Sequence, residues 1–269
     1  CPKLSNINIP SNVKTIDSYA FQNCSSLTSI TIPENITDID SAVFAGCTNL
    51  NEVSLSNNLV SIGEFAFAGC KHIKSISFPN SVVSLGNYAF ENCENLVHIT
   101  PSENLSNIGV DVFQGTVWET SLTDGLNYLG NVAYKYKGDC PEYICLNNGT
   151  TGIAGGAFSE CTMLNYLEIP DSVCYIGEKA FCGCTNLTQI NLPQKISRIE
   201  ADTFVGCTML NYISIPDNVR FIGNRAFYVC TNLEYISIPD TVEEIGEEAF
   251  YYCERLTNFE IPVNIKHIS

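Results

Sequence analysis

A 23-residue repeat runs along the chain and constrains its fold more than any other feature. Cysteines follow one another at this spacing from Cys1 to Cys93 and again from Cys161 to Cys253. From Cys24 on, a phenylalanine precedes each of these cysteines by three residues, and a leucine or isoleucine follows it by three. A repeat this regular indicates a solenoid, in which similar coils stack and together bury the apolar side chains that no single coil could bury.

One unit shows how the repeat becomes structure. In residues 233–239, Ile236 and Ile238 alternate with Tyr235 and Ser237, a pattern that predicts a half-buried strand ending at a proline. Residues 242–246 predict a second, shorter extended segment. Phe250 then precedes a cysteine by three residues, the spacing of one helical turn. We therefore expect an α/β-type repeat solenoid with two strands and a single helical turn in each coil.

The cysteines of the 23-residue column are predicted to point into the core as small apolar side chains. The chain has 14 cysteines, a count that would suggest a disulfide framework in a small secreted protein. Neighbours stacked as a ladder, however, do not readily match disulfide geometry, so we expect free thiols in the column. Two pairings stay open as alternatives elsewhere, Cys140 with Cys145 and Cys174 with Cys182.

The repeating string is Leu-x-x-Ile-x-Ile-Pro-x-x-Val-x-x-Ile-Gly-x-x-Ala-Phe-x-x-Cys, with clear copies at 164–184, 210–230 and 233–253. It resembles the BspA-like leucine-rich repeats. The resemblance implies a right-handed leucine-rich-repeat superhelix with a parallel β-sheet on its concave face and the helical turns on its convex side. It also implies a secreted or cell-surface protein of bacteria or protists, with roles in adhesion and host recognition. It supplies no catalytic residues and names no ligand.

We expect a single solenoid over residues 1–269, interrupted by an irregular insert at 114–143. Phe113 and Phe158 are 45 residues apart, one short of two periods, and Ile144 is already back in register with later coils. Within the insert, Gly130-Asn131 lies between two alternating segments and predicts the turn of a hairpin. Because Cys1 falls partway through a unit, we also expect the chain to be part of a longer protein, whose uncapped coils favour end-to-end self-association.

The insert has two interpretations. As a projecting loop, it would offer aromatic and basic side chains to a partner. The residues of that hairpin contact would be Trp118, Tyr128, Tyr134, Lys135, Tyr136 and Lys137. As a structural splice between two solenoid segments, it would instead pack those aromatic rings against the edge of the coils.

Aligning the units predicts which strand residues face solvent. The first outward column is polar in the N-terminal coils but becomes rich in tyrosine in the C-terminal coils. Tyrosine is enriched at recognition surfaces because it combines a large apolar body with a polar tip, although it also has a high strand propensity. The candidate ligand-binding residues are Tyr143, Tyr166, Glu168, Gln189, Asn191, Tyr212 and Tyr235.

The charge of the chain limits the classes of molecule that it can bind. The net charge of −16 disfavours nucleic acid and anionic lipid surfaces. No run of about 18 apolar residues could form a transmembrane segment. The three histidines, His72, His98 and His267, are not spaced as metal ligands or as part of a catalytic group, so we expect no enzyme activity, no metal and no cofactor.

The favoured hypothesis is an extracellular or cell-surface binding module that recognises a protein or a glycan through its concave sheet. The exposed tyrosines support this hypothesis, because they form an extended recognition surface. The alternative is a structural spacer of a larger surface protein with no ligand of its own. The polar, featureless strand residues of the N-terminal half favour that alternative.

Overall fold

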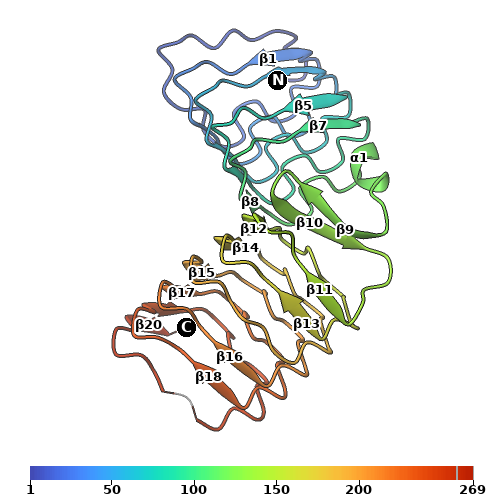
Figure 1. The fold of residues 1–269 in the computed structure, drawn as a ribbon. Coiled ribbons are helices and arrows are strands. Elements are labelled where there is room, and N and C mark those ends of the chain that lie inside the picture. Colours follow the sequence, from blue (N-terminus) through green and yellow to red (C-terminus); the bar gives the residue numbers. More distant parts are fainter. Residues whose placement is uncertain (259, 269) are drawn as a thin grey trace. The chain divides into compact units, whose positions relative to one another are not determined.

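The computed structural model describes residues 1–258 and 260–268 of the chain. The chain divides into two compact units, Cys1–Leu122 (unit 1) and Thr123–Ser269 (unit 2), and each is described by itself. Both units are β-solenoids of stacked coils (Figure 1), and most coils contribute one three-residue and one two-residue strand. That the two units form one continuous solenoid stays a prediction.

The three-residue strands line one face of each unit, which we call the strand face. These strands pair in parallel in twos, one repeat apart, so that Ser29 lies opposite Glu52 and Tyr212 opposite Tyr235. The register predicted from the repeat is therefore confirmed for these pairs. The strands are β1 (Ser29–Thr31), β3 (Glu52–Ser54), β5 (Ser75–Ser77) and β7 (His98–Thr100) in unit 1, and β11 (Tyr143–Cys145), β13 (Tyr166–Glu168), β16 (Tyr212–Ser214) and β18 (Tyr235–Ser237) in unit 2.

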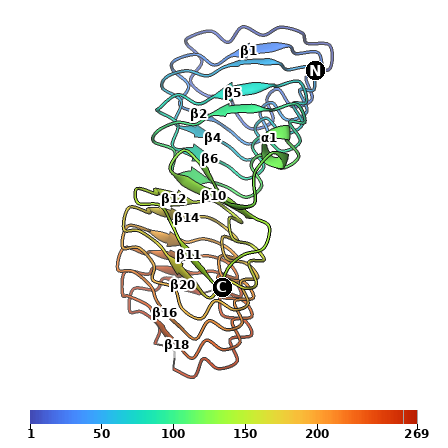
Figure 2. The ribbon, with the colours of Figure 1, turned by 45° about the vertical axis from the view of Figure 1, so that its right-hand side comes forward.

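The two-residue strands pair in parallel with one another, in one sheet in unit 1, where Figure 2 labels β2, β4 and β6 one below another, and in two separate sheets in unit 2. Paired strands are again in a register of one repeat, as in β2 with β4 and β4 with β6. The strands are β2 (Asp38–Ile39), β4 (Ser61–Ile62), β6 (Ser84–Leu85) and β8 (Asn107–Ile108) in unit 1, and β12 (Gly152–Ile153), β14 (Tyr175–Ile176), β15 (Arg198–Ile199), β17 (Phe221–Ile222), β19 (Glu244–Ile245) and β20 (His267–Ile268) in unit 2.

The core consists of columns of identical side chains between these sheets. Phenylalanine rings stack from coil to coil, with 5.2 Å between the centroids of Phe44 and Phe67 and 5.3 Å between those of Phe204 and Phe227. These four rings are fully buried. Aromatic pairs of this kind contribute about 0.5–1.5 kcal/mol each beyond the burial of their area. The repeat therefore stabilises each unit through many equivalent neighbour contacts.

The ladder cysteines line the same core. In most coils the cysteine S–H donates a hydrogen bond to the carbonyl oxygen of the phenylalanine 26 residues earlier, as from Cys207 to Phe181 at 3.2 Å. Burial raises the pKa of the Cys93 thiol to about 12 and that of Cys47 to about 11. The inward-facing column predicted from the spacing is confirmed, and all 14 cysteines of the chain are free thiols in this structure.

The segments after the second strands are turns, so the predicted single helical turns are wrong. Glu248 and Tyr252 have φ angles of 54° and 58°, which an α-helix excludes. Alternate N–H groups donate to a carbonyl oxygen of their own coil, as Tyr251 does to Glu248. The others donate to a carbonyl oxygen of the next coil, as Val229 does to Tyr251. A helix would keep all these bonds inside one coil, whereas the turns use half of them to join coils.

The only α-helix in the described part of the chain is α1 (Val117–Thr120), which lies in the predicted insert. Its N-cap is Thr116, whose hydroxyl accepts a hydrogen bond from the N–H of Glu119. No helix among the described residues is long and apolar enough to cross a membrane.

The insert also contains the predicted hairpin, formed by β9 (Gly125–Leu129) and β10 (Val132–Lys137) in antiparallel pairing. Gly130 in the turn has a φ of 59°, a conformation that glycine adopts without steric cost. The hairpin extends the sheet that contains β12 and β14, because β10 pairs in parallel with β12. β9 then forms the outer strand of the order β14-β12-β10-β9.

Candidate functional site

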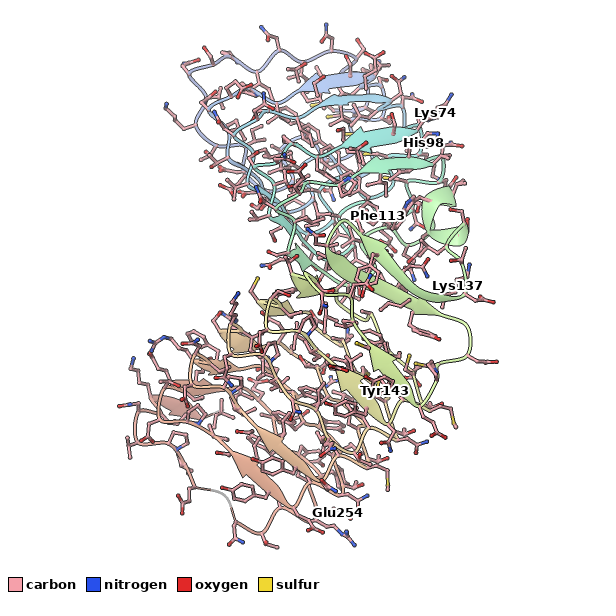
Figure 3. All side chains as sticks on the ribbon, in the orientation of Figure 1. Lys74, His98, Phe113, Lys137, Tyr143 and Glu254 are labelled. Carbon is pink, nitrogen blue, oxygen red and sulfur yellow. The ribbon has the colours of Figure 1, made fainter. Side chains whose placement is uncertain are left out.

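The strongest candidate site is a group of four tyrosines on the strand face of unit 2, which we call the tyrosine ladder: Tyr143, Tyr166, Tyr212 and Tyr235. Each begins a three-residue strand whose middle residue is buried, so its own side chain turns to the opposite side, toward solvent. Tyr143, at the start of β11, is labelled in Figure 3. The exposed fractions are 53% for Tyr143, 46% for Tyr212 and 50% for Tyr235, and Tyr166 is half-buried.

The tyrosines form two stacked pairs. The ring centroids of Tyr143 and Tyr166 are 5.8 Å apart with an interplanar angle of 8°, and those of Tyr212 and Tyr235 are 5.7 Å apart with an angle of 2°. In-register pairing of parallel strands produces this arrangement, because it places identical side chains directly beside one another. Each pair therefore presents ring edges and hydroxyl groups outward, with one flat face at each end of the pair.

Gln189 lies between the two pairs in sequence and bridges to Tyr212 in parallel register. Its side chain and that of Asn191 are on the same face, and both residues are exposed. Glu168 lies two residues after Tyr166 and accepts a hydrogen bond from the hydroxyl of Tyr143. This hydrogen bond raises the pKa of Tyr143 to about 12, because the phenol must give up the proton that it donates to a carboxylate.

A hollow lies at the C-terminal end of the ladder. Asn258 bridges to Tyr235 where another tyrosine would extend the ladder. The hollow has a volume of about 170 Å³. The residues that line it are Tyr235, Ile236, Ser237, Ile238, Asn258 and Glu260. An aromatic ring beside amide and carboxylate groups can bind both the apolar and the polar part of a ligand.

The strand face of unit 1 is different. The residues that occupy the tyrosine column there are Ser29, Glu52, Ser75 and His98, of which the last is labelled in Figure 3. None of them is strongly apolar, and none has a phenol ring. Unit 1 therefore lacks the chemistry that makes the strand face of unit 2 a candidate for recognition.

The predicted hairpin contact is wrong for Tyr134, whose side chain is only 4% exposed. β10 pairs with β12, and Tyr134 lies in the buried N-terminal half of β10. Trp118 is half-buried, and its ring lies 5.1 Å from that of Phe113 in an edge-on contact. Lys135 and Tyr136 are half-buried on β10. This part of the insert packs against the coils, as the splice interpretation expects.

Three features escaped the sequence analysis. The first is a second exposed tyrosine group on the turn side of unit 2, where the ring centroids of Tyr228 and Tyr251 are 5.3 Å apart and those of Tyr251 and Tyr252 are 4.5 Å apart. The guanidinium carbon of Arg225 lies 5.4 Å from the ring centroid of Tyr228. Aligning the residues just before each ladder cysteine would have revealed this group.

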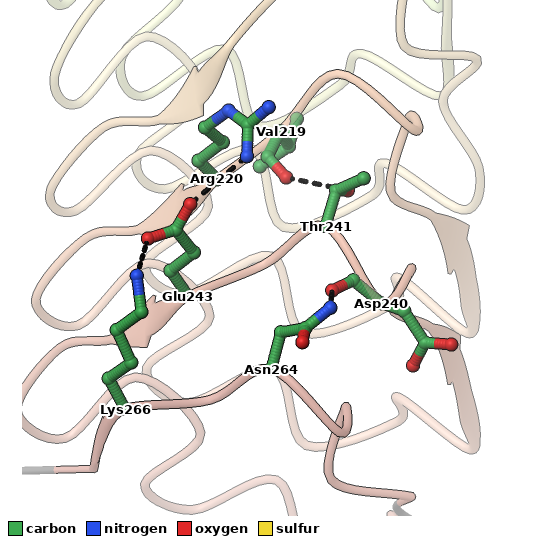
Figure 4. A network of polar contacts seen from close by, with 7 residues as sticks. All are labelled: Val219, Arg220, Asp240, Thr241, Glu243, Asn264 and Lys266. Atoms are coloured by element: carbon green, nitrogen blue, oxygen red, sulfur yellow. Dashed lines mark hydrogen bonds and ion pairs between the residues drawn. The ribbon is translucent and has the colours of Figure 1, made fainter.

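The second feature is a charged column formed by the residues just before β17, β19 and β20, shown in Figure 4. Glu243 accepts a hydrogen bond from Arg220 at 3.0 Å on one side and is paired with Lys266 on the other. Hydrogen bonds from these two cations hold the pKa of Glu243 below its ordinary value. Asn264 donates to the carbonyl of Asp240 at 2.7 Å beside this column and so ties adjacent coils together. These contacts lie at the surface and join adjacent coils.

The third feature is a coupling between two thiols of unit 2, in which interaction with Cys161 lowers the pKa of Cys140, and interaction with Cys140 together with burial raises the pKa of Cys161. Neither of the pairings left open by the sequence, Cys140 with Cys145 or Cys174 with Cys182, joins these two residues. The described residues contain no group of three or more histidine, cysteine or acidic side chains that could hold a metal ion. The ring of His72 is engaged with the carbonyl of Thr48, and the side chain of His267 lies outside the described part of the structure.

The repeat, the parallel sheets and the stacked core columns define a leucine-rich-repeat β-solenoid. The model of the BspA-type leucine-rich repeat region matches residues 1–119 and 151–269 in six copies. The chain therefore belongs to the BspA-type leucine-rich repeat family, and the resemblance inferred from the sequence is confirmed.

Several solved structures resemble the chain. A leucine-rich cell surface protein from Faecalibacterium prausnitzii is 31% identical, with a TM-score of 0.49 over 90% of this chain and 62% of that protein. The chain thus spans less than two thirds of that relative. A leucine-rich repeat protein from Bacteroides ovatus is 29% identical, with a TM-score of 0.46 over 95% of this chain and 78% of that one. No curated protein matches the chain.

Proposed function

We propose that the chain is the binding module of a cell-surface or secreted protein and that it engages a protein or glycan partner through the tyrosine ladder. The observation that carries the proposal is the pairing of exposed tyrosine rings at equivalent positions of successive coils. Interfaces are anchored by aromatic residues that are already held rigid, because little conformational entropy is then lost on binding. Stacking within each pair provides this rigidity.

The charge of the chain limits the partners. A net charge of −16 repels polyanions, and the carboxylates of Glu168 and Glu260 lie on the strand face itself. The proposal therefore favours an uncharged glycan or a neutral to basic polypeptide over sulfated or sialylated glycans. The Glu168 carboxylate is directed to Tyr143 by their hydrogen bond, which leaves the tyrosine rings and amides as the main contact groups.

The surface location is part of the proposal and is supported by the family. The leucine-rich protein from Faecalibacterium prausnitzii is described as a cell surface protein. The matching family is a repeat region, and we assign the module no catalytic role. The spacer alternative is favoured by the strand face of unit 1, where the tyrosine column is replaced by polar residues such as Ser75.

The test is to probe a glycan array and a matrix-protein array with the chain and with a variant carrying Tyr166→Ala, Tyr212→Ala and Tyr235→Ala. We expect binding to at least one neutral glycan or polypeptide, and a loss of affinity of at least tenfold in the variant, since a single anchoring aromatic residue typically contributes more than about 1 kcal/mol. The matched control carries Glu52→Ala, Ser75→Ala and His98→Ala on the strand face of unit 1.

The control variant is expected to bind as the unaltered chain does. Undiminished binding by the tyrosine variant would refute the role of the ladder. A complete absence of binding on both arrays would support the spacer alternative.

A further inference from the structure

The hairpin of the insert and the turn before β12 border a hollow that lies apart from the tyrosine ladder. Its volume is about 230 Å³. The lining residues come from the end of β9, the hairpin turn and the segment between β11 and β12 (Figure 1), so the hollow lies entirely within unit 2. We call it the amide hollow, and the residues that line it include Tyr128, Asn131, Asn147, Asn148, Gly149 and Thr150.

The amide hollow is open because a glycine replaces an asparagine of the regular repeat. In several coils, the asparagine of this column donates its side-chain amide to a backbone carbonyl of the preceding coil, as Asn218 does to Gln194 at 2.6 Å. The register of β12 with β14 places Gly149 in the same column. A Cβ added at Gly149 would have no atom within 4 Å. The glycine therefore leaves open the space between the coil and the hairpin.

Hydrogen bonds hold the walls of the amide hollow in place. The N–H of Asn147 donates to the hydroxyl oxygen of Tyr128 at 3.0 Å. The hydroxyl of Thr150, a buried residue, donates to the carbonyl of Asn147 at 2.6 Å. The N–H of Thr151 donates to the carbonyl of Asn131 at 2.8 Å and so joins the hairpin turn to the coil. Because these walls are already ordered, a ligand would bind at a small cost in conformational entropy.

The lining of the amide hollow is polar but uncharged. Asn131, Asn147 and Asn148 are exposed, and none of their side-chain amides is hydrogen-bonded to another described residue of the chain. Each amide offers two N–H donors and a carbonyl acceptor in one plane. Tyr128 adds a half-buried aromatic ring. Although the chain has a net charge of −16, no acidic or basic side chain of the described residues lines the hollow. A charged ligand would therefore lose its hydration there without gaining a counter-charge.

We propose that the amide hollow binds one ring of a neutral saccharide. Neighbouring hydroxyl groups of a sugar both donate and accept hydrogen bonds, and they match the paired donors and acceptors of asparagine amides. The C–H face of the sugar is apolar and can pack on the ring of Tyr128. The volume of about 230 Å³ is below the roughly 300–1,000 Å³ of sites for drug-sized ligands and suits a single ring. The inference does not depend on the proposed function of the tyrosine ladder, none of whose residues lines the hollow.

The test is saturation-transfer difference NMR of the chain with the methyl glycosides of glucose, galactose, mannose and N-acetylglucosamine, followed by titration of the glycoside with the strongest signal. We expect saturation transfer to at least one of them, and no transfer to any would overturn the proposal. The variant with Tyr166→Ala, Tyr212→Ala and Tyr235→Ala should bind this glycoside as the unaltered chain does. A loss of affinity in that variant would assign the sugar to the tyrosine ladder and overturn the proposal.

Substitutions in the hollow locate the sugar. Gly149→Asn restores the side chain of the regular column and should lower the affinity roughly tenfold or more by filling the hollow. Asparagine tolerates positive φ better than most residues, so it suits the φ of 89° at this position.

Asn148→Ala removes one amide from an exposed position and should lower the affinity about fivefold. Asn218→Ala is the matched control, because it removes an amide of the same column outside the hollow, and it should bind as the unaltered chain does. Undiminished binding by Gly149→Asn, or an equal loss in Asn218→Ala, would overturn the proposal. If Gly149→Asn does not fold, Asn148→Ala decides, and an unchanged affinity contradicts the proposal.

Discussion

The hydroxyl of Tyr143 donates a hydrogen bond to the carboxylate of Glu168, which lies 25 residues later on the neighbouring strand. This bond joins the tyrosine column to the second outward column of the strand face. It orients Tyr143 while the ring stacks on Tyr166. The same bond makes the ladder testable by titration, because the neutral phenol is the form that it stabilises.

Glu168→Gln should return the pKa of Tyr143 from about 12 toward its ordinary value of 10. The amide still accepts a hydrogen bond but carries no charge to oppose the phenolate. Because the folded-state pKa is raised, the stabilisation by this bond is present below pH 10 and is lost as the pH rises through about 12. Phenolate absorbance in a pH titration measures the shift. Asp171→Asn, on the turn after the same strand, should leave the titration unchanged, and an equal shift in both variants would contradict the assignment.

Cys207→Ala should lower the free energy of unfolding by about 1–2 kcal/mol, because it leaves a small cavity in a closely packed column. The Cys207 side chain is fully buried and its S–H donates to the carbonyl of Phe181. The exposed Cys174 provides the control, and Cys174→Ala should change the stability by no more than about 0.5 kcal/mol. Urea denaturation measures both. Equal effects would show that the column contributes no packing.

Val229→Gly should stabilise unit 2 by about 0.5–1 kcal/mol, because it relieves backbone strain. Val229 has a φ of 60° at a position where the preceding coil has Gly206 with a φ of 71°. The left-handed conformation costs a β-branched residue roughly 1–2 kcal/mol, and the added flexibility of glycine in the unfolded chain offsets about half of the gain.

Gly206→Ala is the reciprocal change and should destabilise the unit by about 1 kcal/mol through backbone strain alone. A Cβ at Gly206 would lie 3.9 Å from its nearest neighbours in Gly183, an ordinary contact distance. Thermal or urea unfolding of both variants measures the effect. The strain argument is wrong if the two substitutions shift the stability in the same direction.

Glu243→Gln should destabilise unit 2 at neutral pH but not in acid. The pKa of Glu243 is lowered by hydrogen bonds from Lys266 and Arg220, so its contribution is present above the ordinary carboxyl pKa and is lost as the pH falls through the lowered value. The difference between variant and unaltered chain should therefore shrink below about pH 4. It should also shrink in high salt, because the group lies at the surface. A difference that is independent of pH and salt would assign the effect to packing instead.

Much of the fold could be predicted because the period is a property of the sequence alone. When every coil has the same length, identical positions stack, so the alignment of Tyr212 with Tyr235 and of Ile153 with Ile176 follows from counting. The same counting predicted which residues of each strand face solvent. The hairpin turn at Gly130 was predicted because a two-residue glycine-asparagine connection between alternating segments has few other conformations.

The turns could not be assigned in the same way. Phe250 and Cys253 have the spacing of a helical turn, but the backbone between them passes through positive φ at Tyr252. The choice depends on whether each N–H bonds within its own coil or to the next one. The neighbouring coil places its carbonyl groups within hydrogen-bond distance of these N–H groups. Bonds between coils, such as that from the N–H of Phe227 to the carbonyl of Ala249, therefore replace the bonds of a helix.

By itself, the sequence determined the stacking register, the buried columns and the outward position of the tyrosine ladder, since all three depend only on equal coil length. The tertiary structure alone decided the irregular segment, where the offset between neighbouring coils is shorter than the repeat and the count no longer indicates which residues meet. Packing there turned Tyr134 into the core. The physical reason is that a coil of altered length takes its register from the contacts that it makes with its neighbour.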